Sequence, residues 1–240
     1  DALRVALAAA IRRLPARPPF LIGLRRLFKQ AEMADDAGLF AATAHRFATA
    51  SAMYATPEHS ARRVYVPELQ QALPVVAERA RPDARVGLSV ATLAYFKRRI
   101  WRTLRKRGEA DDPAYAELAA AYLRALSPDD MARPVTRTHF ARDADGAWRR
   151  VTCTSGPLSR NWPASQILSR HDADVRFRYG SLTTENAEGD GTARGEAFPA
   201  LWDERPDLAL DLAAESACEP VALFGVRRLT ETPDALRALP

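Results

Sequence analysis

Apolar side chains recur at spacings of three and four residues through the first fifty positions, which is the pattern of amphipathic helices. The first apolar stripe consists of Leu3, Leu7, Ala10, Ile11 and Leu14. The second consists of Phe20, Leu24, Leu27, Phe28 and Ala31, and a third begins with Leu39, Phe40, Thr43 and Phe47. Prolines and the turn at Asp35, Asp36 and Gly38 separate the stripes. The pattern predicts three helices, of which the second and third form an antiparallel hairpin.

Four prolines between residues 56 and 86 exclude one long helix there, and only a short helix around Leu69, Leu73 and Val76 is expected. The clearest helix follows at residues 89–107, where Ser89 is the expected N-cap and Gly108 the C-terminal stop. A further helix starts at Asp112-Pro113 and ends at Ser127-Pro128.

Residues 135–154 depart from helical periodicity. The runs 135–140 and 148–153 are rich in β-branched and aromatic residues, and residues 143–146 between them have turn chemistry. This combination predicts a β-hairpin. Residues 175–179 alternate apolar and basic side chains and predict another strand, whereas residues 183–196, with three glycines and four acids, predict a mobile loop.

Proline introduces three short helices at the C-terminal end, over residues 208–217, over residues 221–229 and from Pro233 onward. The predicted fold is therefore mainly α, with helical hairpins stacked as a HEAT/armadillo-like array and a small β-hairpin insertion. We expect a helical hairpin region at 1–130, an insertion with the β-hairpin and the mobile loop at 131–197, and a helical repeat region at 198–240 that continues beyond the chain.

Three phrases carry a resemblance to a known group of proteins. They are YFKRRIWRTLRKRG from Tyr95, FPALWDERP from Phe198 and ESACEPV from Glu215. They resemble helical-repeat (HEAT-like) regions of large bacterial proteins that often also carry a WGR module and are described as molybdate-metabolism-regulator-like. The resemblance implies a helical interaction scaffold inside a larger bacterial protein or system, and it implies no catalytic residues. The WGR motif itself is absent from this chain.

Charge is distributed unevenly along the chain. Residues 1–110 contain 20 Lys and Arg against 9 Asp and Glu, whereas residues 111–240 contain 15 against 21. The first part therefore has the charge to attract an anionic partner. A genome rich in G and C also raises the arginine content, and this alternative needs no ligand.

The candidate binding residues lie on the expected helix 89–107. A helical wheel places Leu93, Phe96, Ile100 and Leu104 on one side. The candidates lie on the remaining surface and are Tyr95, Arg98, Arg99, Arg102, Arg105 and Lys106. Seven of the eleven residues from Lys97 to Arg107 are basic, which suits phosphate contacts, and Tyr95 is able to stack on an unpaired base. The alternative is a solvated face, or one that pairs with acids of the second half.

Motifs for catalysis or metal binding are missing from the sequence. The histidines and cysteines show no metal-ligand spacing, and the acidic turn at residues 143–146 has Ala141 and Thr152 where an EF-hand needs acids. No phosphate-binding loop and no nucleophile elbow occurs. We therefore expect no metal, no cofactor and no catalytic residue. The two cysteines, 65 positions apart, favour a reducing compartment.

The sequence predicts a non-catalytic binding scaffold, that is, a cytoplasmic protein–protein interaction domain whose partner is a protein or a neighbouring domain. The first alternative is a nucleic-acid-associated module that uses the basic face of helix 89–107, and the second is an enzyme with an unrecognised site. The apolar run from Leu3 to Leu14 is too short to span a membrane, so no membrane association is expected. The start at Asp1 without methionine suggests a piece of a longer protein.

Overall fold

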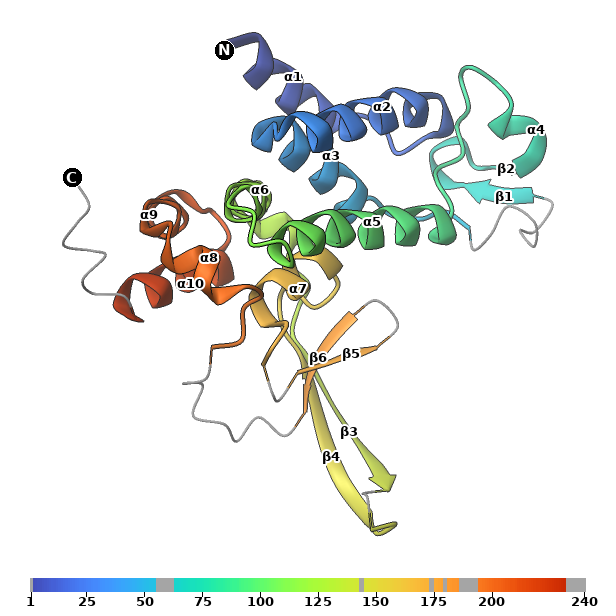
Figure 1. Ribbon diagram of the computed structural model, residues 1–240. Coiled ribbons are helices and arrows are strands. Elements are labelled where there is room, and N and C mark those ends of the chain that lie inside the picture. The colour runs from blue at the N-terminus through green and yellow to red at the C-terminus, as the bar shows by residue number, and fades with distance from the viewer. Residues whose placement is uncertain are drawn as a thin grey trace. The chain divides into compact units, whose positions relative to one another are not determined.

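The computed structural model describes residues 2–54, 63–142, 145–172, 175–178, 181–185 and 194–231 (Figure 1). Its α-helices are α1 (Ala2–Arg13), α2 (Pro18–Ala34), α3 (Ala37–Thr49), α4 (Val75–Arg79), α5 (Val90–Gly108), α6 (Ala114–Arg124), α7 (Trp162–Ser169), α8 (Pro199–Asp203), α9 (Pro206–Glu215) and α10 (Glu219–Glu231). Its strands are β1 (Arg63–Val66), β2 (Gln71–Pro74), β3 (Val135–Arg142), β4 (Trp148–Ser155), β5 (Val175–Arg178) and β6 (Ser181–Glu185), with short 3-10 helices at Pro67–Leu69 and Pro128–Asp130. The described part is mainly helical, as predicted.

The chain divides into two compact units, residues 1–104 and residues 105–240. The boundary lies inside α5, near its C-terminal end. The regions 1–130, 131–197 and 198–240 that the sequence suggested stay a prediction.

The core of the first unit contains an aromatic cluster from α2, α3 and α5. The ring centroids of Phe28 and Phe40 lie 5.5 Å apart, and the rings of Phe47 and Phe96 stack at 3.9 Å. The predicted α2–α3 pair is confirmed, and the Asp36 carboxylate caps α3 by accepting from the Leu39 amide at 3.1 Å. Burial of these rings, all four of them at most 4% exposed, fixes the three helices to each other.

Helix α1 buries a different side from the one its apolar pattern suggested. Ile11 is buried, but Leu3 is 82% exposed and Leu7 is also exposed. The Arg4 guanidinium instead pairs with Asp36 at 2.5 Å, so the helix side that carries Arg4 and Ile11 is turned toward α3. The predicted first helix is confirmed, although Leu3 and Leu7 of its apolar stripe are exposed.

The expected short helix around Leu69, Leu73 and Val76 is wrong. β1 and β2 pair as an antiparallel hairpin, whose buried residues Val66 and Leu73 pack with Val86. Gln70 adopts a left-handed conformation with φ of 49° and reverses the chain, and prolines at 67 and 74 remove the amide donors that a helix needs. Leu69 ends the short 3-10 helix Pro67–Leu69, and Val76 lies in the separate helix α4, which follows Pro74.

Helix α5 begins and packs as its sequence predicts. The Ser89 hydroxyl accepts from the Thr92 amide at 3.1 Å, which confirms it as the N-cap. The predicted apolar face is buried, with Leu93, Phe96, Ile100 and Leu104 each at most 4% exposed. Trp101 is buried beside them.

The helices of the second unit pack around large buried side chains from α6 and α8. The Tyr122 hydroxyl donates to Asn161 Oδ1 at 2.6 Å, and the Tyr115 hydroxyl donates to the Ala197 carbonyl at 3.2 Å. Close packing of α9 and α10 depends on Gly225, because a Cβ there would lie 2.5 Å from the Ala209 carbonyl oxygen. The helices over 208–217 and 221–229 correspond to α9 and α10, whereas the third one, from Pro233, lies outside the described residues.

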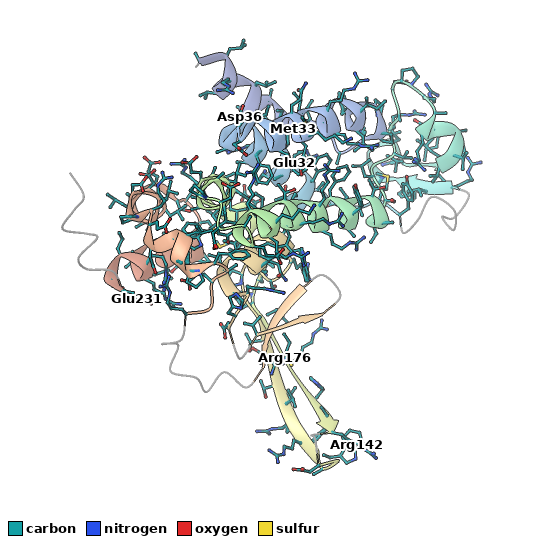
Figure 2. All side chains as sticks on the ribbon, in the orientation of Figure 1. Glu32, Met33, Asp36, Arg142, Arg176 and Glu231 are labelled. Carbon is teal, nitrogen blue, oxygen red and sulfur yellow. The ribbon has the colours of Figure 1, made fainter. Side chains whose placement is uncertain are left out.

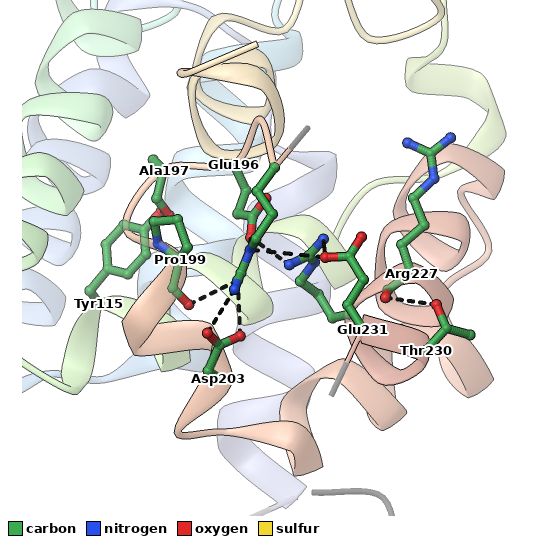
Figure 3. A network of polar contacts seen from close by, with 10 residues as sticks. Tyr115, Glu196, Ala197, Pro199, Asp203, Arg227, Thr230 and Glu231 are labelled. Atoms are coloured by element: carbon green, nitrogen blue, oxygen red, sulfur yellow. Dashed lines mark hydrogen bonds and ion pairs between the residues drawn. The ribbon is translucent and has the colours of Figure 1, made fainter. Parts of the chain in front are cut away.

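A network of ion pairs holds residues 194–197 against α8 and α10 (Figure 3). Arg194 makes two bonds to Asp203, at 2.7 and 2.9 Å. Buried Glu196 accepts from Arg194 at 2.8 Å and from Arg228 at 2.7 Å. The mobile loop expected at 183–196 is therefore wrong at both ends, since residues 181–185 form β6 and residues 194–196 are anchored; residues 186–193 lie outside the described part.

The sheet of the second unit has the strand order β3-β4-β6-β5, with all pairs antiparallel. β3 and β4 pair over eight positions, from Val135 with Ser155 to Arg142 with Trp148. Only Cys153 and Thr154 of β4 also pair with β6, so the rest of the hairpin is a two-stranded ribbon that extends away from the helices of this unit (Figure 1). The predicted β-hairpin is confirmed, and β5 confirms the predicted strand over its described residues.

Candidate nucleic-acid interface

The basic face expected on α5 is exposed in the first unit. Arg98 and Arg102 lie on the solvent side of the helix, opposite the buried apolar face, and Tyr95 is 43% exposed beside them. Neither arginine forms an ion pair with any residue that the structure describes. Their charges are thus available to a ligand.

Arg99 has a different environment from its two neighbours. Its Nη2 donates to Glu32 Oε2 at 2.7 Å, and its guanidinium lies 5.7 Å from the ring centroid of Phe28, so Arg99 links α5 to α2. The Thr103 hydroxyl also donates to Glu32. The Glu32 carboxylate holds the pKa of Arg99 above its ordinary value. We therefore assign Arg99 a structural contact.

Arg105 and Lys106 belong to the second unit, although they lie on the same helix. Both are exposed, and Arg105 forms an ion pair with Glu109 one turn further along, at 3.4 Å. Such exposed pairs hold a side chain only weakly. Of the six candidates, the first unit contains Tyr95, Arg98, Arg99 and Arg102.

Helix α2 adds basic residues that the sequence reading did not include. Arg25, Arg26 and Lys29 are exposed and, with Ile22, line a shallow hollow of about 210 Å³. Their spacing of three and four residues places them on one side of α2. The same spacing, on the polar side of the second apolar stripe, could have indicated these basic residues from the sequence.

The basic residues of α2 and α5 are close enough to act on one group. The hydrogen bond from Arg99, at 3.4 Å, and the charges of Arg102 and Arg25 lower the pKa of the Tyr95 hydroxyl. Arg102 and Arg99 belong to α5, whereas Arg25 belongs to α2, so the Tyr95 hydroxyl is within the electrostatic range of cations on both helices. We call Arg25, Arg26, Lys29, Tyr95, Arg98 and Arg102 the α2–α5 basic surface.

Acidic residues of the first unit do not neutralise this surface. Of those whose side chains are described, Glu32 pairs with Arg99, Asp36 with Arg4, Glu78 with Arg85 and Asp83 with Arg81. Asp35 lies in the turn after α2 and also has a contact of its own. The five cations of the α2–α5 basic surface form no ion pair within the described part of the chain, so they are a net excess of positive charge.

The described residues contain no cluster of three or more His, Cys, Asp and Glu that could hold a metal ion. His139 Nδ1 lies 3.9 Å from Cys153 Sγ on the β3–β4 hairpin. This is a long hydrogen bond between two side chains on an exposed part of the hairpin. His59 lies outside the described residues, and the two cysteines, both described, form no disulfide.

No helix in the described ranges has both the length and the apolar character needed to cross a bilayer. Comparison with known proteins gave no matching family model, no matching curated protein and no matching solved structure. The resemblance to WGR-associated helical-repeat proteins stays a prediction from the sequence. The proposals below therefore depend on the geometry and charge of this chain.

Proposed function

We propose that this protein is a non-catalytic binding protein that holds the phosphate backbone of a nucleic acid on the α2–α5 basic surface. The observation that carries the proposal is the presence of five exposed cations without ion pairs on two helices that the Arg99–Glu32 pair joins, with exposed Tyr95 on one of them. Clustered Lys and Arg neutralise successive phosphates and release condensed counterions, which drives binding. An exposed tyrosine beside them offers a ring to an unpaired base.

The arrangement of Glu32 favours this proposal over a merely solvated face. Glu32 is the one acidic residue of α2, and its carboxylate accepts hydrogen bonds from Arg99 and Thr103 of α5. A phosphate approaching Arg25 or Arg102 therefore meets an acid whose charge is already compensated. Residues 1–104 contain 17 Lys and Arg against 8 Asp and Glu. This positive net charge adds a long-range attraction for polyanions.

The salt dependence of binding tests this proposal. Binding of a fluorescently labelled oligonucleotide would be measured by anisotropy at several salt concentrations, for the unaltered protein and for the triple variant Arg25→Ala, Arg98→Ala and Arg102→Ala. Each lost phosphate contact lowers the slope of log K against log salt by about 0.7 to 0.9. The triple variant should therefore bind more weakly, and its affinity should depend less steeply on salt, with the magnitude of the slope smaller by about 2 to 3.

A matched control separates this surface from net charge. The triple variant Arg12→Ala, Arg13→Ala and Arg79→Ala removes the same charge from exposed positions of α1 and α4. It should leave both affinity and salt slope nearly unchanged. Equal losses in the two triple variants would mean that only net charge matters, and unchanged binding in the first would overturn the proposal.

A helical binding scaffold for a protein partner or a neighbouring domain is the second proposal, and the HEAT/armadillo-like stacking belongs to it. The observation in its favour is the exposed apolar side of α1, where Leu3 and Leu7 lie in solvent. Apolar association withstands salt, whereas phosphate contacts weaken. A complex that persists in high salt after nuclease treatment, and is lost with Leu3→Glu and Leu7→Glu, would support the scaffold.

A further inference from the structure

One face of the β3–β4 ribbon carries two exposed aromatic rings and two arginines near its outer end. Phe140 is 67% exposed and Trp148 is 64% exposed. The register pairs Phe140 with Arg150 and Arg142 with Trp148, and paired residues point to the same face. The four side chains therefore alternate ring and cation across the two strands.

The position of the ribbon leaves this face open. Arg142 lies at the far end of the hairpin in Figure 2, where the described residues of the second unit place no other strand or helix beside it. The Arg142 guanidinium lies 5.2 Å from the centroid of the Trp148 ring. This cation–π contact fixes the orientation of both groups while the exposed part of the indole stays accessible.

Pairs of threonines connect the two strands on the same face, between the tip of the hairpin and the four-stranded sheet. The hydroxyls of Thr138 and Thr152 lie 3.3 Å apart, and those of Thr136 and Thr154 lie 3.1 Å apart. Cross-strand hydroxyl pairs of this kind stabilise a ribbon that has no buried side. This face is thus polar along the inner part of β3 and β4 and carries the rings and cations at its outer end.

Protection of an exposed edge strand accounts for only part of this composition. Charged side chains discourage unwanted strand pairing, and β3 and β4 together contain four arginines and no acid. Exposed Phe and Trp have the opposite effect, because they enlarge the apolar area in water. Their presence on the same face as Arg142 and Arg150 therefore points to a ligand that offers both flat rings and negative charge.

We infer that this ribbon face binds unpaired bases of a single-stranded nucleic acid, with bases stacked on Phe140 and Trp148 and neighbouring phosphates held by Arg142 and Arg150. Bases in a duplex are stacked on each other, so the two rings can be used fully only by a strand whose bases are unstacked. The inference rests on the proposed function in naming nucleic acid as ligand, but its residues all belong to the second unit.

Titration with an oligothymidylate and with a duplex of equal length tests the inference. The single strand should bind more tightly, and it should quench tryptophan fluorescence because Trp148 is far more exposed than buried Trp101 and Trp202. Trp148→Ala and Phe140→Ala should each weaken single-strand binding by about tenfold, as loss of one base–ring stack does. Trp148→Phe keeps a ring and should retain most of the affinity while the fluorescence response falls.

Leu223→Ala is the matched control, because it removes an exposed apolar side chain from α10 of the same unit. It should leave oligonucleotide affinity unchanged. Unchanged affinity in Trp148→Ala, or equal affinity for duplex and single strand, would overturn the inference and assign the rings to a protein ligand. Failure of the proposed function gives a different result. If the ribbon variants lose binding while the triple variant at Arg25, Arg98 and Arg102 binds normally, only the role of the α2–α5 basic surface is contradicted.

Discussion

Arg102 of the first unit and Arg228 of the second unit are both helical arginines, but their environments differ. Arg102 is exposed on α5 and forms no ion pair within the described part of the chain. Arg228 is 5% exposed and bonds to Glu196 at 2.7 Å and to Glu231 at 2.5 Å. The second unit thus uses this arginine to join α10 to the segment before α8, whereas the first unit leaves Arg102 in water.

The same contrast extends to neighbouring residues. Arg194 and Arg205 of the second unit each bond to two acids, and these bonds raise the pKa of both guanidinium groups. In the first unit, only Arg99 of the α5 candidates has such a partner. Arginine therefore has two roles in this chain: Arg194, Arg205 and Arg228 cross-link parts of the second unit, whereas Arg98 and Arg102 of α5 keep their charge in water.

Replacing Glu196 with alanine should have the largest effect on stability. The change removes the Glu196 carboxylate from the buried guanidinium of Arg228 and also removes one partner of Arg194. Breaking a buried ion pair in this way costs about 3–5 kcal/mol of unfolding free energy. Urea unfolding followed by circular dichroism measures the unfolding free energy, and Glu204→Ala, at an exposed position, is the control. A loss below about 1 kcal/mol in Glu196→Ala would mean that the ion-pair network is dispensable for stability.

Replacing Ile100 with alanine should lower the unfolding free energy by about 2–5 kcal/mol, because the side chain is buried in the core of the first unit. This result would show that α5 is held by its apolar side. Thermal and urea unfolding measure the change, and Arg102→Ala is the control on the opposite side of the helix. A loss no larger than that of the control would contradict the packing.

Acid should weaken the Glu78–Arg85 pair of the first unit. Hydrogen bonds from Arg85 hold the pKa of Glu78 below its ordinary value of 4.5, so the folded state binds this proton less readily than the unfolded state. The pair therefore stabilises the fold fully above about pH 4.5, and the stabilisation is lost as the pH falls through the lowered pKa. Glu78→Gln should flatten this part of the stability–pH curve; a curve of unchanged shape would exclude the contribution.

Replacing Arg98, Arg102 and Arg105 together with alanine should have the smallest effect on stability. Arg98 and Arg102 lack ion pairs in the described part, and the Arg105–Glu109 pair is exposed. Alanine keeps the helix propensity, so the unfolding free energy should change by less than about 1 kcal/mol. Unfolding of this variant would show that the arginines pair with acids, as in the second unit, and the comparison between the units would fail.

Local patterns predicted the elements that depend on neighbouring residues. The four-residue period of Leu93, Phe96, Ile100 and Leu104 predicted which side of α5 is buried, and Ser89 predicted where it begins. Two β-prone runs around an acidic turn predicted β3 and β4. The β1–β2 hairpin was missed because Leu69, Leu73 and Val76 have helical spacing, and only the left-handed turn at Gln70 brings Val66 and Leu73 into one core.

By itself, the sequence determined the helical character of the chain, the two sides of α5 and the β3–β4 hairpin, because periodicity, capping and turn chemistry act over a few residues. Only the tertiary structure decided which arginines are neutralised. Arg99 meets Glu32, which is 67 positions away, and Arg205 meets Glu117, 88 positions away. Coulomb attraction depends on distance in space, which charge spacing along the chain does not specify.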